Sequence, residues 1–140
     1  MTWVLYAILS AFFASLVVIF GKIGIKGIDS NLAVAIRTVI IVIFAWAIVF
    51  IQGNARDILK IPKHSMIFIA LSAVATGLSW LFYFKALQMG EASHVAPVEK
   101  ISVALTVILA FLFLGEQPTL GNVLGGVLVT AGVLVTVLIK

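Results

Sequence analysis

The chain of 140 residues is 64% hydrophobic and only 10% charged, with a mean hydropathy of +1.30. Soluble domains are about 45–50% apolar and about 25% charged, so this composition excludes an ordinary soluble domain. The absence of cysteine excludes disulfides and thiolate metal sites. The net charge of +4 comes largely from the ends of apolar segments, where membrane anchoring explains it and nucleic-acid binding is not needed.

Five apolar segments occupy nearly the whole chain. In chain order they cover 3–20, 32–51, 66–89, 95–114 and 119–139. Each comes close to the 20 or so residues with which a helix crosses the hydrocarbon core. Because the backbone must satisfy its own hydrogen bonds in lipid, helices are the natural solution. The sequence predicts a single all-α domain over 1–140, a polytopic bundle of five transmembrane helices in the cell membrane.

Short connections between the segments predict antiparallel neighbours. The first connection, 21–30, is glycine-rich, and Asp29 or Ser30 can cap the following helix through a side-chain oxygen. The third, 90–93, is a tight turn that predicts a helical hairpin. In the last connection Gly115 ends one helix and the proline at 118 helps to start the next.

The basic residues of the connections do not favour one membrane orientation. The two sides carry three cations each, Arg56, Lys60 and Lys63 against Lys22, Lys26 and Lys140. Counting residues just inside the helix ends adds Arg37, Lys85 and Lys100 to the second side. The positive-inside signal is therefore weak or depends on the count, and the chain is expected to be able to insert in both orientations.

Ionisable side chains inside the apolar segments are the main candidates for function. Arg37 lies about 9 Å into the second segment, and Lys85 is near the end of the third. If the fourth helix starts near Ala92, Glu99 lies about 10 Å into it. The antiparallel arrangement places all three at the same end of the bundle. A charge at such depth costs at least a few kcal/mol unless it is paired or hydrated, so these side chains should face the protein interior.

Two interpretations of Glu99 remain open. It either neutralises Arg37 or Lys85 and fixes helix packing, or it binds or titrates during a transport cycle. Lys22 and Lys100 are expected to extend to the headgroups. The excess of cations over this single buried carboxylate indicates a site for an organic anion or a zwitterion.

Two helix faces are expected to line a polar cleft. They consist of Glu99, Ser102 and Thr106 on the fourth segment, and of Thr76, Trp80 and Tyr83 on the third. Trp80 and Tyr83 fit cavity lining and ordinary packing equally well. Pro97 removes a backbone donor beside Glu99 and predicts a kink with a conformational role.

The last segment carries a face of small residues. Gly121 and Gly125 have the GxxxG spacing, Gly132 continues the same face, and Gly126 lies beside it. Small residues let helices approach closely in lipid. This face either packs within one chain or pairs with a second copy.

No pattern points to catalysis, a metal or a cofactor. His64 and His94 both lie in connections, and neither has a partner at ligand spacing. The chain is therefore not expected to be an enzyme.

Several short motifs together resemble a known family. They are Asp29-Ser30 followed by Ala35-Ile36-Arg37, Tyr83-Phe84-Lys85-Ala86-Leu87 with Gly90-Glu91-Ala92, Val95-Ala96-Pro97-Val98, Leu114-Gly115-Glu116, and the glycine-rich stretch 124–133. With them the chain resembles, over essentially its whole length, a five-helix EamA-type member of the drug/metabolite transporter superfamily. The resemblance implies that Arg37, Lys85, Pro97 and Glu99 border the cleft and that Glu116 is a structural helix-end residue.

The resemblance also implies an assembly. Most relatives contain two five-helix units in one polypeptide, inverted with respect to each other, whereas this sequence has one. We therefore expect a homodimer, in an antiparallel arrangement, or a pair with another subunit. The expected function is transport of a small metabolite, anionic or zwitterionic, by alternating access. The alternatives are a non-transporting membrane subunit and a component of a lipid-linked flippase, each acting with a partner.

Overall fold

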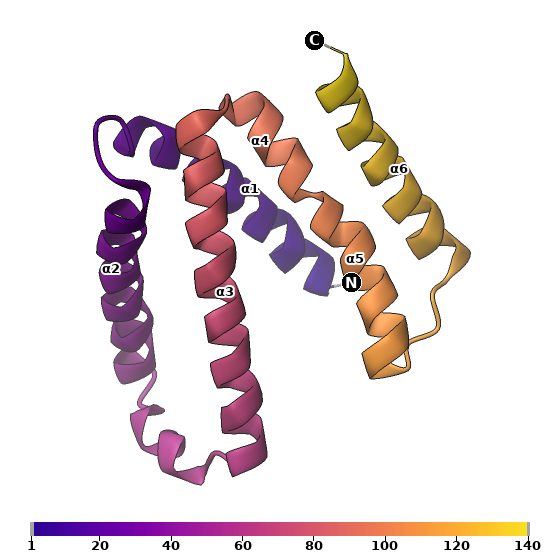
Figure 1. The fold of residues 1–140 in the computed structure, drawn as a ribbon. Helices are drawn as coiled ribbons and strands as arrows, with labels where there is room; N and C mark the ends of the chain where they lie inside the picture. Colours follow the sequence, from indigo (N-terminus) through magenta and orange to yellow (C-terminus); the bar gives the residue numbers. More distant parts are fainter. Residues whose placement is uncertain (1, 140) are drawn as a thin grey trace. The chain divides into compact units, whose positions relative to one another are not determined.

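The computed structural model describes residues 2–139, and in that part of the chain it contains helices and no strand (Figure 1). The long helices are α1 (Thr2–Gly24), α2 (Ser30–Ile51), α3 (Lys63–Met89), α4 (Ala92–Glu99), α5 (Ile101–Leu109) and α6 (Leu120–Leu138). Two shorter elements are a 3₁₀ helix, η1 (Ala55–Lys60), and a π-helical turn, η2 (Ala110–Leu114). The all-α prediction is confirmed. Lys140, used above in the charge count, lies outside the described residues.

Five stretches are long and apolar enough to cross a membrane. They are α1, α2, α3, the continuous run Ala92–Leu114 and α6. Between 0% and 11% of each apolar window is buried, so most apolar side chains face outward, as lipid requires. The five predicted segments are confirmed, and the chain is a multi-pass membrane protein.

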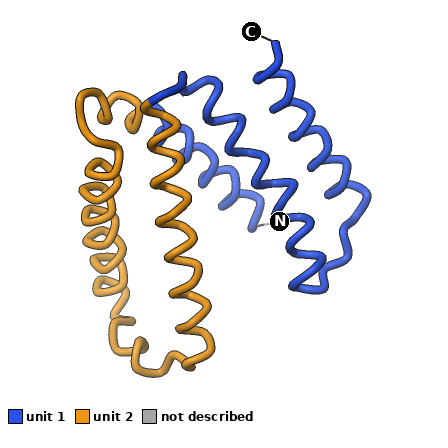
Figure 2. The backbone as a smooth tube through the Cα atoms, viewed as in Figure 1, with its two compact units in different colours: residues 1–19, 89–140 blue, residues 20–88 orange. Residues whose placement is uncertain are grey.

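The described chain forms two compact units (Figure 2). Unit 1 combines residues 1–19 with 89–140, and unit 2 covers 20–88. Each is described by itself below. The single domain over 1–140 stays a prediction.

Local chemistry fixes both ends of α2 in unit 2. The Asp29 carboxylate accepts hydrogen bonds from the backbone N–H groups of Asn31 and Leu32, at 2.9 and 3.1 Å, which confirms Asp29 as the N-cap. The helix ends at Ile51, and Gly53 follows its cap with a φ of +75°, which is accessible at little cost only to glycine. The N–H of Gly53 then donates to the Phe50 carbonyl and closes the last turn.

Helices α1 to α4 each extend beyond their apolar segments. Two of these extensions have a clear physical reason. The first helix continues from residue 20 to Gly24, and the third begins at Lys63 and not at residue 66. Both extensions include a lysine. The apolar segment marks the part of a helix inside the hydrocarbon, whereas the helix itself continues into the headgroup region, where lysine is stable.

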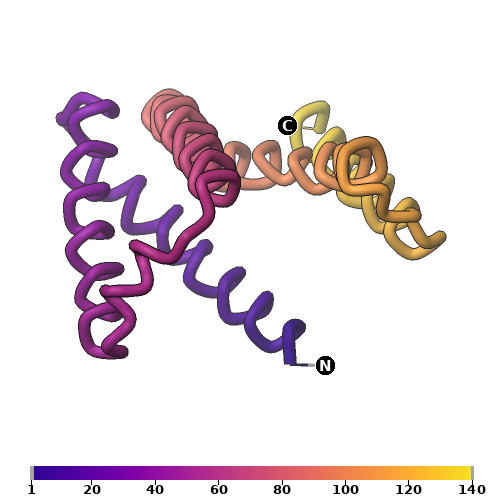
Figure 3. Tube along the Cα trace, turned by 90° about the horizontal axis from the view of Figure 1, so that it is seen from below, coloured from indigo at the N-terminus to yellow at the C-terminus, as the bar shows by residue number. Residues whose placement is uncertain are grey.

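Helices α2 and α3 run in opposite directions and are joined by η1. Seen from below, they diverge toward this connection (Figure 3). They meet at the other end, where side chains at the start of α2 contact those at the end of α3. The candidate site of unit 2 lies at this meeting point.

In unit 1 the fourth membrane-spanning stretch is interrupted at Lys100. The Lys100 N–H donates to the Pro97 carbonyl at 2.9 Å, so one turn is tightened to 3₁₀ geometry between α4 and α5. Pro97, which lacks an N–H, lies three residues earlier. The predicted disturbance of this helix is present, and its centre is Lys100.

Both α4 and α5 pack against α6. The π-helical turn η2, which follows α5, is terminated by Gly115. The φ of +68° at Gly115 confirms it as the helix-ending residue. The Thr119 hydroxyl accepts the Asn122 N–H at 3.2 Å and caps α6. Pro118 therefore precedes this cap instead of occupying the first helical turn.

Candidate functional site

Arg37 lies in α2 with its guanidinium against two aromatic rings of α3. Its Cζ is 4.4 Å from the ring centroid of Trp80 and 4.7 Å from that of Phe84. An aromatic face attracts a cation, and the attraction grows when water is excluded. The Nη1 atom is buried and has no hydrogen-bond partner among the described residues. The guanidinium of α2 thus contacts two rings of α3, and its Nη1 still has N–H groups that no described residue accepts from.

Phe84, one of the two rings beside Arg37, belongs to a small set of buried residues in unit 2. Its members are Ile25, Ser30, Val34, Phe84 and Leu87, all at most 6% exposed. Phe84 packs on Gly21, where an added Cβ would lie 3.2 Å from the ring atom Cζ. The cluster therefore brings the end of α1 and the start of α2 against the end of α3.

Two polar side chains attach the last turn of α3 to this cluster. The Lys22 ammonium donates to the Leu87 carbonyl, and the Gln88 amide donates to the Ile28 carbonyl at 2.7 Å. The last carbonyls of a helix lack partners within it, and a cation there also interacts favourably with the helix dipole. Lys22 thus binds the protein itself at the point where α1 continues into the headgroup region.

The other predicted residues of unit 2 are arranged around α3. Tyr83 is half-buried and makes an edge-to-face contact with Phe84, with 6.2 Å between ring centroids. Thr76 is exposed and donates its hydroxyl to the Ser72 carbonyl of its own helix. Lys85 is also exposed, because it follows Phe84 by one residue and so lies about 100° around the helix. The structure therefore brings Trp80 to Arg37. Thr76 lies one turn before Trp80 on the same helix face but is exposed, and Lys85 lies on another face.

Glu99 in unit 1 forms an ion pair with its neighbour. Its Oε2 lies 2.7 Å from the Lys100 ammonium, and the two side chains are 38% and 53% exposed. Lys100, like Lys22, is therefore engaged with the protein. The predicted pairing of Glu99 with Arg37 or Lys85, which lie in unit 2, stays a prediction.

The polar face predicted beyond Glu99 is divided by the interruption at Lys100. Thr106 donates its hydroxyl to the Ser102 carbonyl at 2.7 Å, so both residues are linked within α5. Thr106 also lines a hollow of about 120 Å³ that Glu116 and Asn122 share. Glu99 and Ser102 do not line this hollow.

The glycines of α6 have different surroundings. Gly126 is buried, and a Cβ there would lie 3.6 Å from the Ala104 Cα in α5. At Gly125 and Gly132 no such atom lies within 4 Å, and at Gly121 the nearest is the hydroxyl of Thr119, at 3.7 Å. Packing inside unit 1 thus uses Gly126, whereas the GxxxG face remains open there.

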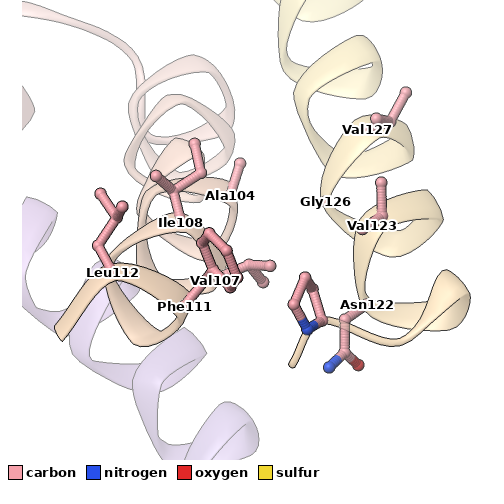
Figure 4. A pocket seen from close by; sticks show the side chains of 10 residues that line it. Ala104, Val107, Ile108, Phe111, Leu112, Asn122, Val123, Gly126 and Val127 are labelled. Atoms are coloured by element: carbon pink, nitrogen blue, oxygen red, sulfur yellow. The ribbon is translucent and has the colours of Figure 1, made fainter. Parts of the chain in front are cut away.

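An apolar groove of about 480 Å³ lies between the α5–η2 stretch and α6 (Figure 4). Its walls are Ala104, Val107, Ile108, Phe111, Leu112, Pro118, Asn122, Val123, Gly126 and Val127. Asn122 is the one side chain with a polar group, so the groove differs from the polar cleft that the sequence predicts.

Sequence reasoning did not select three residues that shape these sites. The sequence could have indicated Phe84 as a packing residue, because Trp80, Phe84 and Leu87 follow the i, i+4, i+7 spacing of one helix face. Gly126 had no such signal, since the GxxxG spacing pointed to the neighbouring face. The contact of Lys22 with a carbonyl 65 residues away has no local signature either.

Comparisons with known proteins agree with this architecture. The model of the EamA-like transporter family matches residues 1–138. A Sinorhizobium protein named as an uncharacterized transporter in the cobO 3′ region is 44% identical over 133 residues, which cover 95% of this chain and 94% of that protein. An uncharacterized protein from Methanocaldococcus jannaschii is 34% identical over 101 residues, covering 66% of this chain and 74% of that protein. No solved structure matches.

The match to the family model extends over all five membrane-spanning stretches. The Sinorhizobium protein is also matched almost from end to end, so it is about as long as this chain. Both comparisons confirm the resemblance found in the short motifs. This chain belongs to the EamA-like transporter family.

Proposed function

We propose that the chain transports a small anionic or zwitterionic metabolite across the cell membrane by alternating access, as a homodimer. The observation that carries the proposal is the position of Arg37. Its guanidinium lies within a membrane-spanning helix, between two aromatic rings, with a buried nitrogen that no described residue accepts from. A charged group in such a place is costly and usually serves a substrate or ion pathway.

The chemistry of arginine supports an anionic group as the ligand. Its planar fork of N–H donors matches a carboxylate through two parallel hydrogen bonds. Trp80 and Phe84 lie beside the guanidinium, and no described residue accepts a hydrogen bond from its Nη1. Because Nη1 is buried, a carboxylate reaches it only after the rings shift. Such local opening belongs to an alternating-access cycle.

The proposed homodimer follows from the single five-helix unit. Transporters with inverted repeats place the substrate between two such units near the middle of the membrane. The open face of Gly121, Gly125 and Gly132 supports contact with a second copy. The weak orientation signal supports an antiparallel pair. The chain supplies no catalytic role in this proposal, and transport would be driven by gradients of ions or substrate.

Counterflow in proteoliposomes containing this chain alone tests the proposal. We expect a pool of radiolabelled monocarboxylates and amino acids to exchange, and a pool of organic cations not to. Arg37→Gln should abolish exchange, whereas Lys85→Gln, which removes an exposed cation on the neighbouring helix, should retain it. No exchange of any pool by the chain alone would contradict transport by a homodimer and would favour a subunit that needs a partner. Recovery of exchange with a co-purified second protein would then favour a subunit that acts with a partner, including a lipid-linked flippase component.

A further inference from the structure

The connection between α2 and α3 is held at the membrane boundary. Both helices are membrane-spanning stretches, and η1 lies between the end of one and the start of the other (Figure 1). Because α2 ends at Ile51 and α3 begins at Lys63, this connection starts and ends at the membrane boundary. We call residues 55–63 the interfacial segment.

The interfacial segment exposes apolar side chains. Leu59 is 89% exposed, and Ile58 and Ile61 are 43% and 37% exposed. Leucine and isoleucine favour removal from water, and the acyl chains beside the two helices are the apolar phase within reach. Leu59 thus marks the side of the segment that would face the hydrocarbon.

The same segment carries an excess of cations. Arg56, Lys60 and Lys63 stand against one carboxylate, Asp57, which pairs with Lys60 at 2.7 Å. Arg56 and Lys63 form no ion pair with any described residue. Long basic side chains next to an apolar one are suited to reach from an acyl boundary up to phosphate groups.

We propose that the interfacial segment is a docking surface for anionic phospholipids. Leu59 inserts among the acyl chains, and Arg56 and Lys63 bind the phosphates of the surrounding headgroups. Two features select a lipid over a soluble anion: the segment is fixed at the boundary by α2 and α3, and a free anion would satisfy the cations while leaving Leu59 in water. The alternative is that the interfacial segment lies in water beside the membrane and binds no lipid. This inference does not depend on Arg37 or on transport.

The absence of native cysteine allows a single fluorescent probe. In Leu59→Cys, labelled with the environment-sensitive dye NBD, we expect blue-shifted emission in vesicles of phosphatidylcholine mixed with phosphatidylglycerol. Spin labels on the acyl chains of phosphatidylglycerol should quench the dye more strongly than the same labels on phosphatidylcholine. Each cation near an anionic surface changes local lipid binding about fivefold at most, so Arg56→Gln with Lys63→Gln should bring the two quenching efficiencies close together.

A probe in another connection provides the matched control. Gln117→Cys lies between η2 and α6, next to Glu116 and without a basic neighbour, and its dye should be quenched equally by both labelled lipids. Equal quenching at Leu59→Cys by the two lipids would overturn the anionic preference. Emission typical of water at Leu59→Cys would overturn insertion. Both results are independent of transport, so they leave the proposed function untouched.

Discussion

At the scale of single residues, the cations of this chain are stabilised in three different ways. Arg37 lies against aromatic rings, Lys22 binds a helix-end carbonyl, and Lys100 pairs with Glu99. Each arrangement fits its surroundings. A delocalised guanidinium tolerates loss of water best, whereas a compact ammonium needs oxygen acceptors. Of these three cations, Arg37 is the one without an oxygen acceptor among the described residues, and it is therefore the best suited of them to receive an anion from outside.

The aromatic partner of Arg37 should also stabilise the fold. Phe84 is 3% exposed and contacts both Gly21 and Arg37, so Phe84→Ala should leave a cavity and reduce the free energy of unfolding by about 3–5 kcal/mol. Phe82 lies on the same helix and is 75% exposed, so Phe82→Ala should change it by no more than about 0.5 kcal/mol. Denaturation in detergent measures the free energy of unfolding of both variants. Equal losses would contradict the assignment of Phe84 to a packed cluster.

The geometry of the guanidinium should matter as well as its charge. Arg37→Lys keeps a cation but loses the planar fork and the stacked contact with Trp80. If a carboxylate is bound through two parallel hydrogen bonds, losing one of them should raise the KM for the transported anion about tenfold. Concentration-dependent uptake into proteoliposomes measures this. An unchanged KM in Arg37→Lys would show that charge alone is sufficient.

At the scale of helices, the spans and caps of single helices could be predicted from the sequence, but the contacts between helices could not. The five membrane-spanning stretches, the Asp29 cap and the turn at Gly115 were predicted because each depends on residues adjacent in sequence. Which face of a helix meets its neighbour depends on tertiary packing. The sequence therefore did not single out Gly126 as the glycine that packs against α5, and Phe84 was not selected. Similarly, Pro97 indicated a disturbed helix, but the position of the tightened turn at Lys100 depends on how the following residues relax.

The glycine pair of α6 allows a test of helix packing. In Gly126→Leu, the Cβ would lie 3.6 Å from the Ala104 backbone, and the carbons beyond it would meet α5. Such overpacking should lower the free energy of unfolding by about 1–3 kcal/mol. Gly125→Leu places the same side chain where no such atom lies within 4 Å of the Cβ, and it should leave the stability of the single chain unchanged. The reverse order of stabilities would contradict the observed α5–α6 contact.

At the scale of the whole molecule, the same substitution separates folding from assembly. If the face of Gly121, Gly125 and Gly132 meets a second copy, Gly125→Leu should retain the melting temperature of the monomer in detergent and lose the dimer in the membrane. Single-molecule photobleaching in vesicles counts the copies directly. Two bleaching steps in Gly125→Leu, as in the wild type, would exclude this face from the interface.

Orientation provides the remaining test of the assembly. Because the basic residues of the connections are evenly divided, the barrier to inserting either way round should be small. A cysteine at position 56, replacing Arg56 in the interfacial segment, should then react with impermeant reagents applied to either face of intact cells. In an antiparallel dimer the two interfacial segments lie in opposite leaflets, so each face should label about half of the chains. Labelling from one face alone would leave a parallel dimer or a heteromeric partner. Because replacing Arg56 itself shifts the charge balance, the same assay at Gln52 serves as the control with all cations retained.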